Sequence, residues 1–265
     1  MRLEGKTVLL TGATGGLGAS IARGLAERGT RLVLSARKAE ALEGLAASLP
    51  GEHRIAPADL GADGAAERLA ADAGDVDGLV ANAGLPGTGT VESFSPDELK
   101  RALRVNLESP MLLAQALAPG MSDRHEGHLV FVSSLAGKAP SPRTAIYAAT
   151  KFGLRGFAFC LRADLAPSGV GVSLIVPGFI RAAGMFADSG AKPPPGLGTS
   201  SPQEVAAAVV KAIERDKMEI AVAPRRQRAL AHLGLASPRI AMRAITGGTA
   251  RKAADRVAEG QANKR

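Results

Sequence analysis

Short apolar runs alternate with longer amphipathic segments along most of the chain. The apolar runs are rich in Val, Leu and Ile, which is typical of strands buried on both faces of a parallel sheet. In the segments between them, apolar residues recur every three or four positions, as on one face of a helix. Strands are predicted at 7–11, 31–35, 53–58, 78–82, 128–133, 170–176 and 218–223, and helices at 19–28, 38–48, 62–71, 95–118, 145–165 and 202–215. The pattern therefore predicts an α/β fold, with a doubly wound parallel sheet of about seven strands and helices on both faces.

Local signals mark where this pattern begins and breaks. Ser95, with Glu98 three residues later, is the pattern of a capping box at a helix start. Pro110 is expected to bend the helix that follows. Residues 178–201 are rich in Gly, Pro and Ser, which is typical of a lid or a disordered loop. No boundary is expected before residue 224, so 1–223 is predicted to form one domain.

The positive charge of the chain is concentrated in residues 224–265. The sequence has 33 Lys and Arg against 25 Asp and Glu, and ten of the basic residues lie in this segment beside only Asp255 and Glu259. We expect a basic, helical C-terminal extension. Basic amphipathic helices are typical of membrane-surface contact, and the alternative is a helix packed on the body with a solvated basic face. Nucleic-acid binding is not expected, because the segment has no aromatic residue to stack on a base.

The few cysteines and histidines narrow the chemistry. Cys160 is the only cysteine, which excludes an intramolecular disulfide and a cysteine-based metal cluster. The four histidines have no ligand spacing, so no metal is expected. The sequence shows neither a signal-peptide pattern nor an apolar run of about 18 residues, so a cytoplasmic protein is expected.

A glycine-rich segment follows the first predicted strand. Gly12 would permit a sharp turn, Gly16 the close approach of a pyrophosphate, and Gly18 the close packing of helix on sheet. The free N–H groups at the start of the helix would face the phosphates. The position after an apolar strand favours a Rossmann-like dinucleotide site over an ordinary turn. The whole segment is Thr11-Gly12-Ala13-Thr14-Gly15-Gly16-Leu17-Gly18.

The end of the second predicted strand indicates which nicotinamide cofactor binds. NAD-binding folds usually place an Asp or Glu there to hold the ribose hydroxyls. Here no carboxylate is present, and Arg37 can form a charge-assisted fork on a 2′-phosphate. Ser35 and Thr14 can add hydroxyl donors. The pattern favours NADP(H) over NAD(H), with an exposed cation at a helix start as the alternative for Arg37.

One face of the predicted helix at 145–165 carries the only tyrosine of the chain and a lysine. Tyr147 and Lys151 are four residues apart, and a neighbouring ammonium favours the phenolate, so the pair suits acid–base chemistry. Ser134 ends a predicted strand, where ligands of such sheets bind, and its hydroxyl can donate to an oxygen that gains charge. Strand alternation directs either Ser134 or Ser133 toward the site, and the spacing to Tyr147 favours Ser134.

These motifs resemble those of the short-chain dehydrogenase/reductase family, of the compact cytosolic type. The resemblance covers residues 5 to about 223, and it implies a homodimer or homotetramer. Each motif is weak alone, but together they follow the order of the family. The motifs are Thr11-Gly-x-x-x-Gly16-x-Gly18, Asp59-Leu60, Asn82-Ala83-Gly84, Asn106, Ser134, Tyr147-x-x-x-Lys151 and Pro177-Gly178.

The resemblance implies a role for each of these residues. Tyr147 would exchange the proton, Lys151 would hold the nicotinamide ribose and lower the pKa of Tyr147, and Ser134 would polarise the carbonyl. Asn106 would support a water-linked proton relay, with the plugging of a helix bend as its alternative, and Asn82 has a purely structural alternative. The cofactor would contact Gly12, Thr14, Gly15, Gly16, Leu17, Gly18, Ser35, Arg37, Asp59, Leu60, Asn82, Ala83, Gly84, Tyr147, Lys151, Pro177, Gly178 and Ile180.

The implied activity is the transfer of a hydride between NADP(H) and a small-molecule carbonyl or alcohol. A lid at 184–201 with Met185, Phe186 and Leu197 favours a hydrophobic or lipid-like substrate, unless the segment is a disordered loop. The chain departs from the family at Ala182, where a threonine often contacts the nicotinamide carboxamide, which puts that contact in doubt. The alternative function is a catalytically silent NADP(H)-binding regulator or scaffold.

Overall fold

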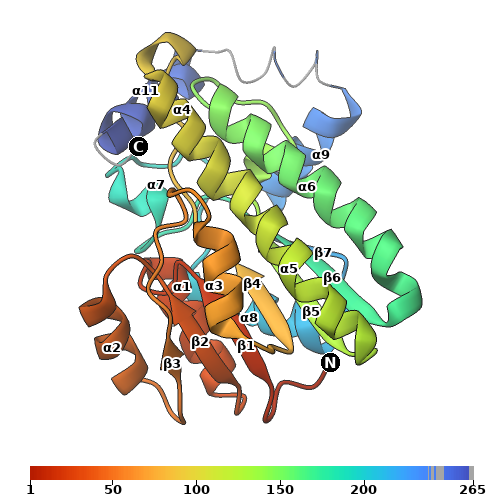
Figure 1. Cartoon of the computed structure of the whole chain (residues 1–265). Helices are drawn as coiled ribbons and strands as arrows, with labels where there is room; N and C mark the ends of the chain where they lie inside the picture. The colour runs from red at the N-terminus through yellow and green to blue at the C-terminus, as the bar shows by residue number, and fades with distance from the viewer. Residues whose placement is uncertain (238, 240–241, 243–247, 263–265) are drawn as a thin grey trace.

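The computed structural model of the protein describes residues 1–237, 239, 242 and 248–262. In this part of the chain, seven parallel strands form one sheet in the order β3-β2-β1-β4-β5-β6-β7 (Figure 1). The strand order reverses between β1 and β4, which leaves a crevice at the carboxyl ends of the strands. The predicted α/β, Rossmann-like doubly wound sheet is confirmed. The strands are β1 (Thr7–Thr11), β2 (Arg31–Ser35), β3 (Arg54–Ile55), β4 (Gly78–Ala81), β5 (Gly127–Val132), β6 (Val170–Pro177) and β7 (Glu219–Val222).

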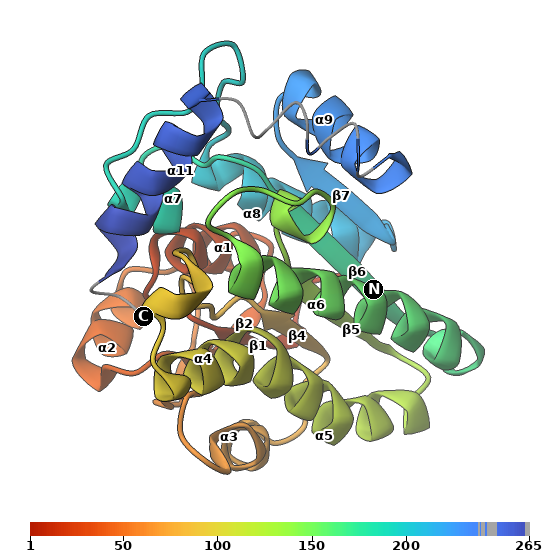
Figure 2. The same ribbon diagram turned by 90° about the horizontal axis from the view of Figure 1, so that it is seen from above.

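Helices cover both faces of the sheet (Figure 2). Leu10 of β1 packs in the apolar core beneath α1, α2 and α8, whereas Leu9 packs in the core on the opposite face. Both side chains are fully buried, which explains why the strands are apolar along their whole length. One face is covered by α1 (Gly16–Ala26), α2 (Ala39–Ala47) and α8 (Pro202–Glu214), and the other by α3 (Ala65–Ala73), α4 (Pro96–Leu103), α5 (Ser109–Asp123) and α6 (Ala145–Leu165).

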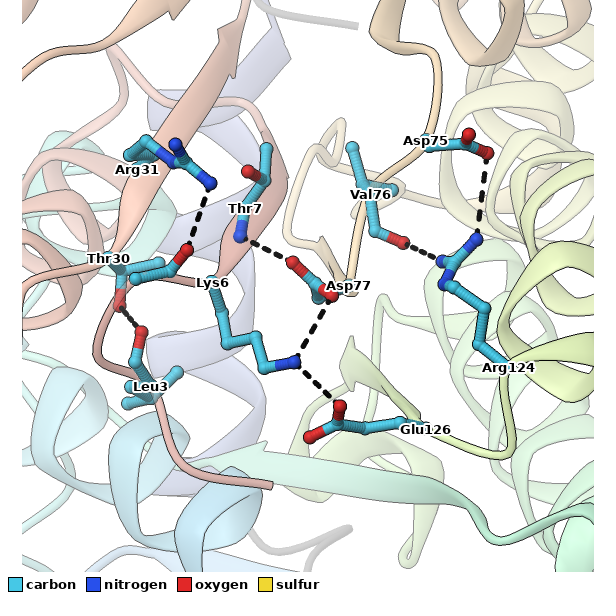
Figure 3. Close-up of polar contacts among 11 residues, drawn as sticks. Leu3, Lys6, Thr7, Thr30, Arg31, Asp75, Val76, Asp77, Arg124 and Glu126 are labelled. Atoms are coloured by element: carbon cyan, nitrogen blue, oxygen red, sulfur yellow. Dashed lines mark hydrogen bonds and ion pairs between the residues drawn. The ribbon is translucent and has the colours of Figure 1, made fainter.

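An ion-pair network ties the amino ends of the strands together (Figure 3). The Lys6 ammonium lies 2.6 Å from Glu126 and 3.5 Å from Asp77. The second oxygen of Asp77 accepts a hydrogen bond from the Thr7 N–H at 2.8 Å. These contacts join the amino ends of β1, β4 and β5 to one another. Ligands of such sheets bind at the opposite, carboxyl ends of the strands.

The helix predicted at 95–118 is interrupted before Pro110. It begins with the Ser95 capping box, in which both reciprocal hydrogen bonds are present, as predicted. A π-helical turn, η2 (Arg104–Glu108), then separates α4 from α5, and the Ser109 N–H donates to the Arg104 carbonyl five residues back. Because Pro110 has no N–H for the carbonyl of residue 106, the regular helical ladder cannot continue. The bend expected at Pro110 is therefore a π turn that contains Asn106.

The segment after β6 and the C-terminal extension lie over the carboxyl edge of the sheet, opposite the N-terminus (Figure 1). Residues 178–201 contain the short helix α7 (Met185–Asp188), and a bridge between Ile180 and Ser200 joins the two ends of this segment. The extension forms α9 (Arg225–Ala236) and α11 (Gly248–Gln261). Its remaining residues, 238, 240–241, 243–247 and 263–265, lie outside the described part of the chain. None of the described helices is long and apolar enough to cross a membrane.

Candidate active site

The glycine loop between β1 and α1 is crowded at the positions that the sequence singled out. Gly12 has a φ of 65°, and a Cβ there would lie 2.8 Å from the Ala83 Cα. A Cβ at Gly18 would lie 2.0 Å from the Gly12 carbonyl oxygen, so Gly18 lets the helix fold back on the loop itself. α1 begins at Gly16, within the loop, and its N-cap residue Gly15 makes no side-chain hydrogen bond to the first N–H groups of the helix. The loop therefore has the geometry that a pyrophosphate group needs.

Asn82 holds the glycine loop against β4. Its side-chain nitrogen donates to the carbonyls of Thr11 at 3.0 Å and Gly12 at 3.2 Å. The backbone N–H groups of Asn82 and Ala83 both donate to the Thr11 hydroxyl at 3.1 Å. These bonds support the structural reading of Asn82, since its amide shapes the loop that would contact the cofactor.

Three charged groups meet beyond the end of β2. Arg37 is exposed, and the positive charge of its guanidinium lowers the pKa of Asp59, which lies after β3. Arg101 of α4 donates to both oxygens of Asp59, at 2.9 and 3.0 Å. Burial opposes the ionisation of Asp59, but the Gly61 N–H, Arg101 and Arg37 together lower its pKa. Arg101 is a cation of this corner that the sequence analysis missed, because it comes from a distant helix whose contacts no motif marks.

The remaining members of this predicted set lie where the strands end. Ser35 is the last, buried residue of β2, and its carbonyl accepts a hydrogen bond from the Ala13 N–H. Thr14 is exposed on the glycine loop, and Leu60 is buried beside Asp59.

The predicted Ser134, Tyr147 and Lys151 are brought together at the carboxyl end of β5. The Ser134 side chain lies beside the phenol of Tyr147, and the Lys151 Nζ lies 5.6 Å from the centre of that ring. The Lys151 ammonium donates to the Val132 carbonyl at 3.0 Å. Ser133 instead donates to the Lys151 carbonyl at 3.2 Å, so it ties the strand to α6 and leaves Ser134 to face Tyr147.

The pKa values of the pair differ from the expectation that the lysine lowers the pKa of the tyrosine. Burial raises the pKa of Tyr147 to about 12, and the hydrogen bond from Ser134 opposes this rise. Burial lowers the pKa of Lys151 to about 8. The physical reason is desolvation, which disfavours both charged forms. At neutral pH the site therefore holds a protonated phenol beside an ammonium.

Asn106 lies fully buried in the π turn. Its side-chain oxygen accepts from the Leu85 N–H at 2.7 Å, and its side-chain nitrogen donates to the Leu85 carbonyl at 2.9 Å. A Cβ at Gly84 would lie 3.2 Å from the same oxygen. Asn106 thus lies in the helix bend and fixes the segment that follows Asn82-Ala83-Gly84.

The segment after β6 lies directly on the glycine loop. A Cβ at Gly16 would lie 2.4 Å from the Ala183 Cβ, and a Cβ at Gly84 would lie 3.1 Å from the end of the Met185 side chain. Ala182 has a φ of 66°, an unusual value for a residue with a side chain. Of the predicted contacts, Pro177 is the last residue of β6, and Gly178 and Ile180 lie at the start of the segment that follows it.

Two buried glutamines of the extension bond the backbone of the segment after β6, and neither was predicted from the sequence. Gln227 of α9 bonds the backbone next to Gly178, and Gln261 of α11 bonds the backbone of Met185. An uncharged side chain in a basic, polar tail has no pattern that marks it as buried. Only the fold reveals these contacts.

Comparison with known proteins agrees with this geometry. Residues 6–193 match the family model of short chain dehydrogenases. The chain is 37% identical over 227 residues to the ketoacyl reductase HetN of Nostoc sp., a match that covers 83% of this chain and 79% of that protein. It is 41% identical over 187 residues to dehydrogenase/reductase SDR family member 7B of Bos taurus, covering 66% of this chain but only 58% of the relative. A metagenomic short-chain oxidoreductase solved in complex with NADP superposes with a TM-score of 0.72 and 34% identity, covering 84% of this chain and 98% of that one.

Proposed function

The chain belongs to the short-chain dehydrogenase/reductase family, and on that premise we propose that it is an NADP(H)-dependent oxidoreductase acting on a hydrophobic carbonyl or alcohol. The observation that carries the proposal is the placement of Ser134 and the buried Lys151 beside the Tyr147 ring, with the Lys151 Nζ 5.6 Å from the ring centre. A catalytically silent regulator or scaffold would need the glycine loop to bind the cofactor. It would not need a phenol, a hydroxyl and an ammonium at one point of the crevice, which are the groups that proton transfer uses.

In the direction of reduction, NADPH supplies the hydride to the carbonyl carbon when it is bound. The Ser134 hydroxyl donates to the carbonyl oxygen, where negative charge develops. Tyr147 gives its proton to that oxygen, which completes the alcohol. The Lys151 ammonium stabilises the phenolate that remains. In the reverse direction, the Tyr147 phenolate takes the proton from the alcohol.

The proton that Tyr147 gives up must be replaced from solvent. The side chain of Asn106 is occupied by Leu85, so we assign the relay to the Asn106 backbone carbonyl. Pro110 has no N–H to donate to that carbonyl, which leaves a hydrogen-bonding direction for a water molecule. The water would link the site to solvent.

The proposed substrate is apolar near its carbonyl. Met185 lies against Gly84, and the rings of Phe179 and Phe186 are 4.6 Å apart on the same segment. The similarity to a ketoacyl reductase supports a ketone of an acyl chain as the first compound class to test. The match to a structure solved with NADP, together with Arg37 and the missing carboxylate after β2, supports NADP(H) over NAD(H).

The test is a panel of ketones, aldehydes and 3-ketoacyl thioesters of graded chain length, followed by NADPH absorbance with NADH alongside. We expect Tyr147→Phe to lower kcat/KM by about 10³-fold or more, because the proton donor is lost. The NADPH Kd should change by less than about threefold, since the ring is kept. Turnover that survives Tyr147→Phe would refute this assignment. A wild-type chain that binds NADPH and reduces no member of the panel would favour the silent scaffold.

We propose further that 1–223 is the catalytic domain, that 224–265 is a basic extension, and that the chain is a homodimer or homotetramer. A groove of about 840 Å³ between α5 and α6 supports the last point, because it is lined by Leu103, Met111 and Phe157 and would be covered by a second copy. Sedimentation of the full chain measures the stoichiometry.

We propose that the protein works in the cytoplasm and that its basic extension contacts an anionic membrane surface.

A further inference from the structure

We infer that the C-terminal extension clamps the whole segment 178–201 over the cofactor crevice, and that Gln227 and Gln261 are its two positioning residues. This segment includes the lid predicted at 184–201 and is called the lid from here on. The inference deepens the proposed function and rests on it for the identity of what the lid covers. The contacts that carry it are backbone contacts of the lid, which exist whatever the substrate is.

Gln227 of α9 holds both ends of the lid. Its side-chain oxygen accepts a hydrogen bond from the Phe179 N–H at 3.1 Å. Its side-chain nitrogen donates to the carbonyls of Leu197 at 3.2 Å and Gly198 at 2.9 Å. Only 5% of Gln227 is exposed. One buried amide therefore satisfies a donor and two acceptors of the lid backbone and joins the two ends of the lid.

Gln261 of α11 holds the middle of the lid to the opposite wall of the crevice. Its side-chain nitrogen donates to the Met185 carbonyl at 2.8 Å, and its oxygen accepts from the Thr88 hydroxyl at 2.6 Å. Gln261 is 3% exposed. Thr88 follows Gly87, whose carbonyl accepts from the Tyr147 N–H at 3.1 Å. Gln261 thus connects the lid to the segment that contacts the proposed proton donor.

A third contact ties α11 to the loop before α6. The Asp255 carboxylate accepts from Arg143 at 2.6 Å, and the Arg143 carbonyl accepts from the Gly89 N–H at 2.7 Å. α11 also packs closely on α7, since a Cβ at Gly260 would lie 2.3 Å from the Ser189 carbonyl oxygen. The extension therefore contacts the lid, the loop before α6 through Arg143, and the segment at Thr88 that lies beside Tyr147.

The position of the lid decides the width of the crevice. Ala183 lies on the glycine loop and Met185 on Gly84, so a lid released from the extension would uncover both the cofactor and the carbonyl side of the site. Removing the Gln227 amide would leave the Phe179 N–H and the carbonyls of Leu197 and Gly198 without this partner, and removing the Gln261 amide would leave the Met185 carbonyl without it. The lid would then reach water by moving outward.

The experiment measures amide hydrogen exchange of the full chain, with and without NADPH. The variants are Gln227→Met and Gln261→Met, which keep the length and apolar burial of the side chain but remove its hydrogen bonds. Gln203→Met, at an exposed position on α8, is the matched control. We expect exchange within 179–200 to be at least about tenfold faster in both variants and unchanged in the control. Exchange in β1, β4 and β5 should stay as in the wild type.

Unchanged exchange in the lid of both variants would overturn the inference. So would a rise of equal size in the strands, because it would mean that the glutamines stabilise the whole fold and not the lid. With the carbonyl that the wild type reduces fastest, we expect Gln261→Met to raise KM about 5- to 20-fold and to change kcat less than threefold. If the wild type reduces none of the panel, the proposed function fails while the exchange result still decides the clamp.

Discussion

At the scale of single residues, the protonation of Tyr147 and Lys151 sets the direction that the site favours. Burial holds the phenol protonated, with a pKa of about 12, and lowers the pKa of Lys151 to about 8. A protonated phenol is ready to give a proton to a carbonyl that receives a hydride. Oxidation of an alcohol requires the opposite state, so it is expected to need a higher pH.

The pH dependence follows from the lowered pKa of Lys151. Below about pH 8 the ammonium is present, and as the pH rises through this value it is lost. We therefore expect kcat/KM for reduction to be flat between about pH 6 and 7.5 and to fall above about pH 8. Steady-state kinetics in constant-ionic-strength buffers measure the profile. Lys151→Met should remove the inflection along with most of the activity, and an inflection that survives this change would assign it to another group.

Arg37 is the residue at which cofactor preference is expected to be decided. Its exposed guanidinium has the reach for a 2′-phosphate, and Asp59 beside it is already engaged by Arg101. Arg37→Ala should raise the NADPH Kd about 10- to 100-fold and leave the NADH Kd within about threefold, since charge-assisted pairs contribute about 1.5–3 kcal/mol. Fluorescence titration measures both constants. Lys38→Ala, at the next exposed position, is the control, and equal losses for both cofactors would contradict the assignment.

At the scale of elements, the π turn η2 converts a helix into a support for the crevice. Asn106 pairs with both backbone groups of Leu85 from within this turn, and Leu85 follows the Asn82-Ala83-Gly84 motif. π turns within helices are often found at functional sites because they redirect one side chain at the cost of a regular hydrogen bond.

The loss of this support has an expected magnitude. Asn106→Ala would leave two buried backbone groups of Leu85 without partners, so we expect the free energy of unfolding to fall by about 2–4 kcal/mol. Urea denaturation measures it. Gln203→Ala, on an exposed position of α8, should change it by less than about 0.5 kcal/mol. If Asn106→Ala lowers the free energy of unfolding by less than about 1 kcal/mol, the hydrogen bonds between Asn106 and Leu85 are not needed to stabilise this region.

The sequence predicted the elements well where one physical rule governs them. The apolar runs located all seven strands, and Ser95 with Glu98 located the start of α4. The length of β3 was overestimated: the strand is Arg54–Ile55, although the Ala56 N–H still donates to the Leu34 carbonyl of β2 at 2.9 Å before the chain reaches the corner at Asp59. Pro110 predicted a bend in the helix. The sequence does not predict that this bend is a π turn, in which the Ser109 N–H bonds the carbonyl five residues back. The site roles of Gln227, Gln261 and Arg101 depend on contacts between segments far apart in the chain, which no local pattern contains.

At the scale of the whole molecule, the amino and carboxyl ends of the strands have different surroundings. The amino edge is closed by Lys6 and its carboxylate partners (Figure 3). At the carboxyl ends of the strands, the lid and the extension lie over the sheet (Figure 1). On the extension, α9 turns Gln227, Ala231 and Gly234 inward. Its basic residues stay exposed, so packing on the body and contact with an anionic surface are compatible.

The membrane proposal is tested without removing the extension, since deletion would also release the lid. Arg225→Gln with Arg228→Gln removes two exposed cations of α9. Each cation contributes about 1 kcal/mol near an anionic surface, so we expect roughly tenfold or greater weakening of partitioning onto phosphatidylglycerol-containing vesicles. Flotation measures it. Lys211→Gln on α8 with Arg215→Gln just after its end makes the same charge change elsewhere, and equal effects of the two pairs, or none, would end the proposal.

The clamp also has a consequence for the order of assembly. The hydrogen bonds of Gln261 join residues 173 and 76 positions apart, and the Arg143 pair spans 112. Contacts that close such long loops form late, because the entropy of loop closure must be overcome first. In renaturation from urea, nucleotide affinity should thus return before turnover does, and the interval between the two would report the time at which the last helix docks.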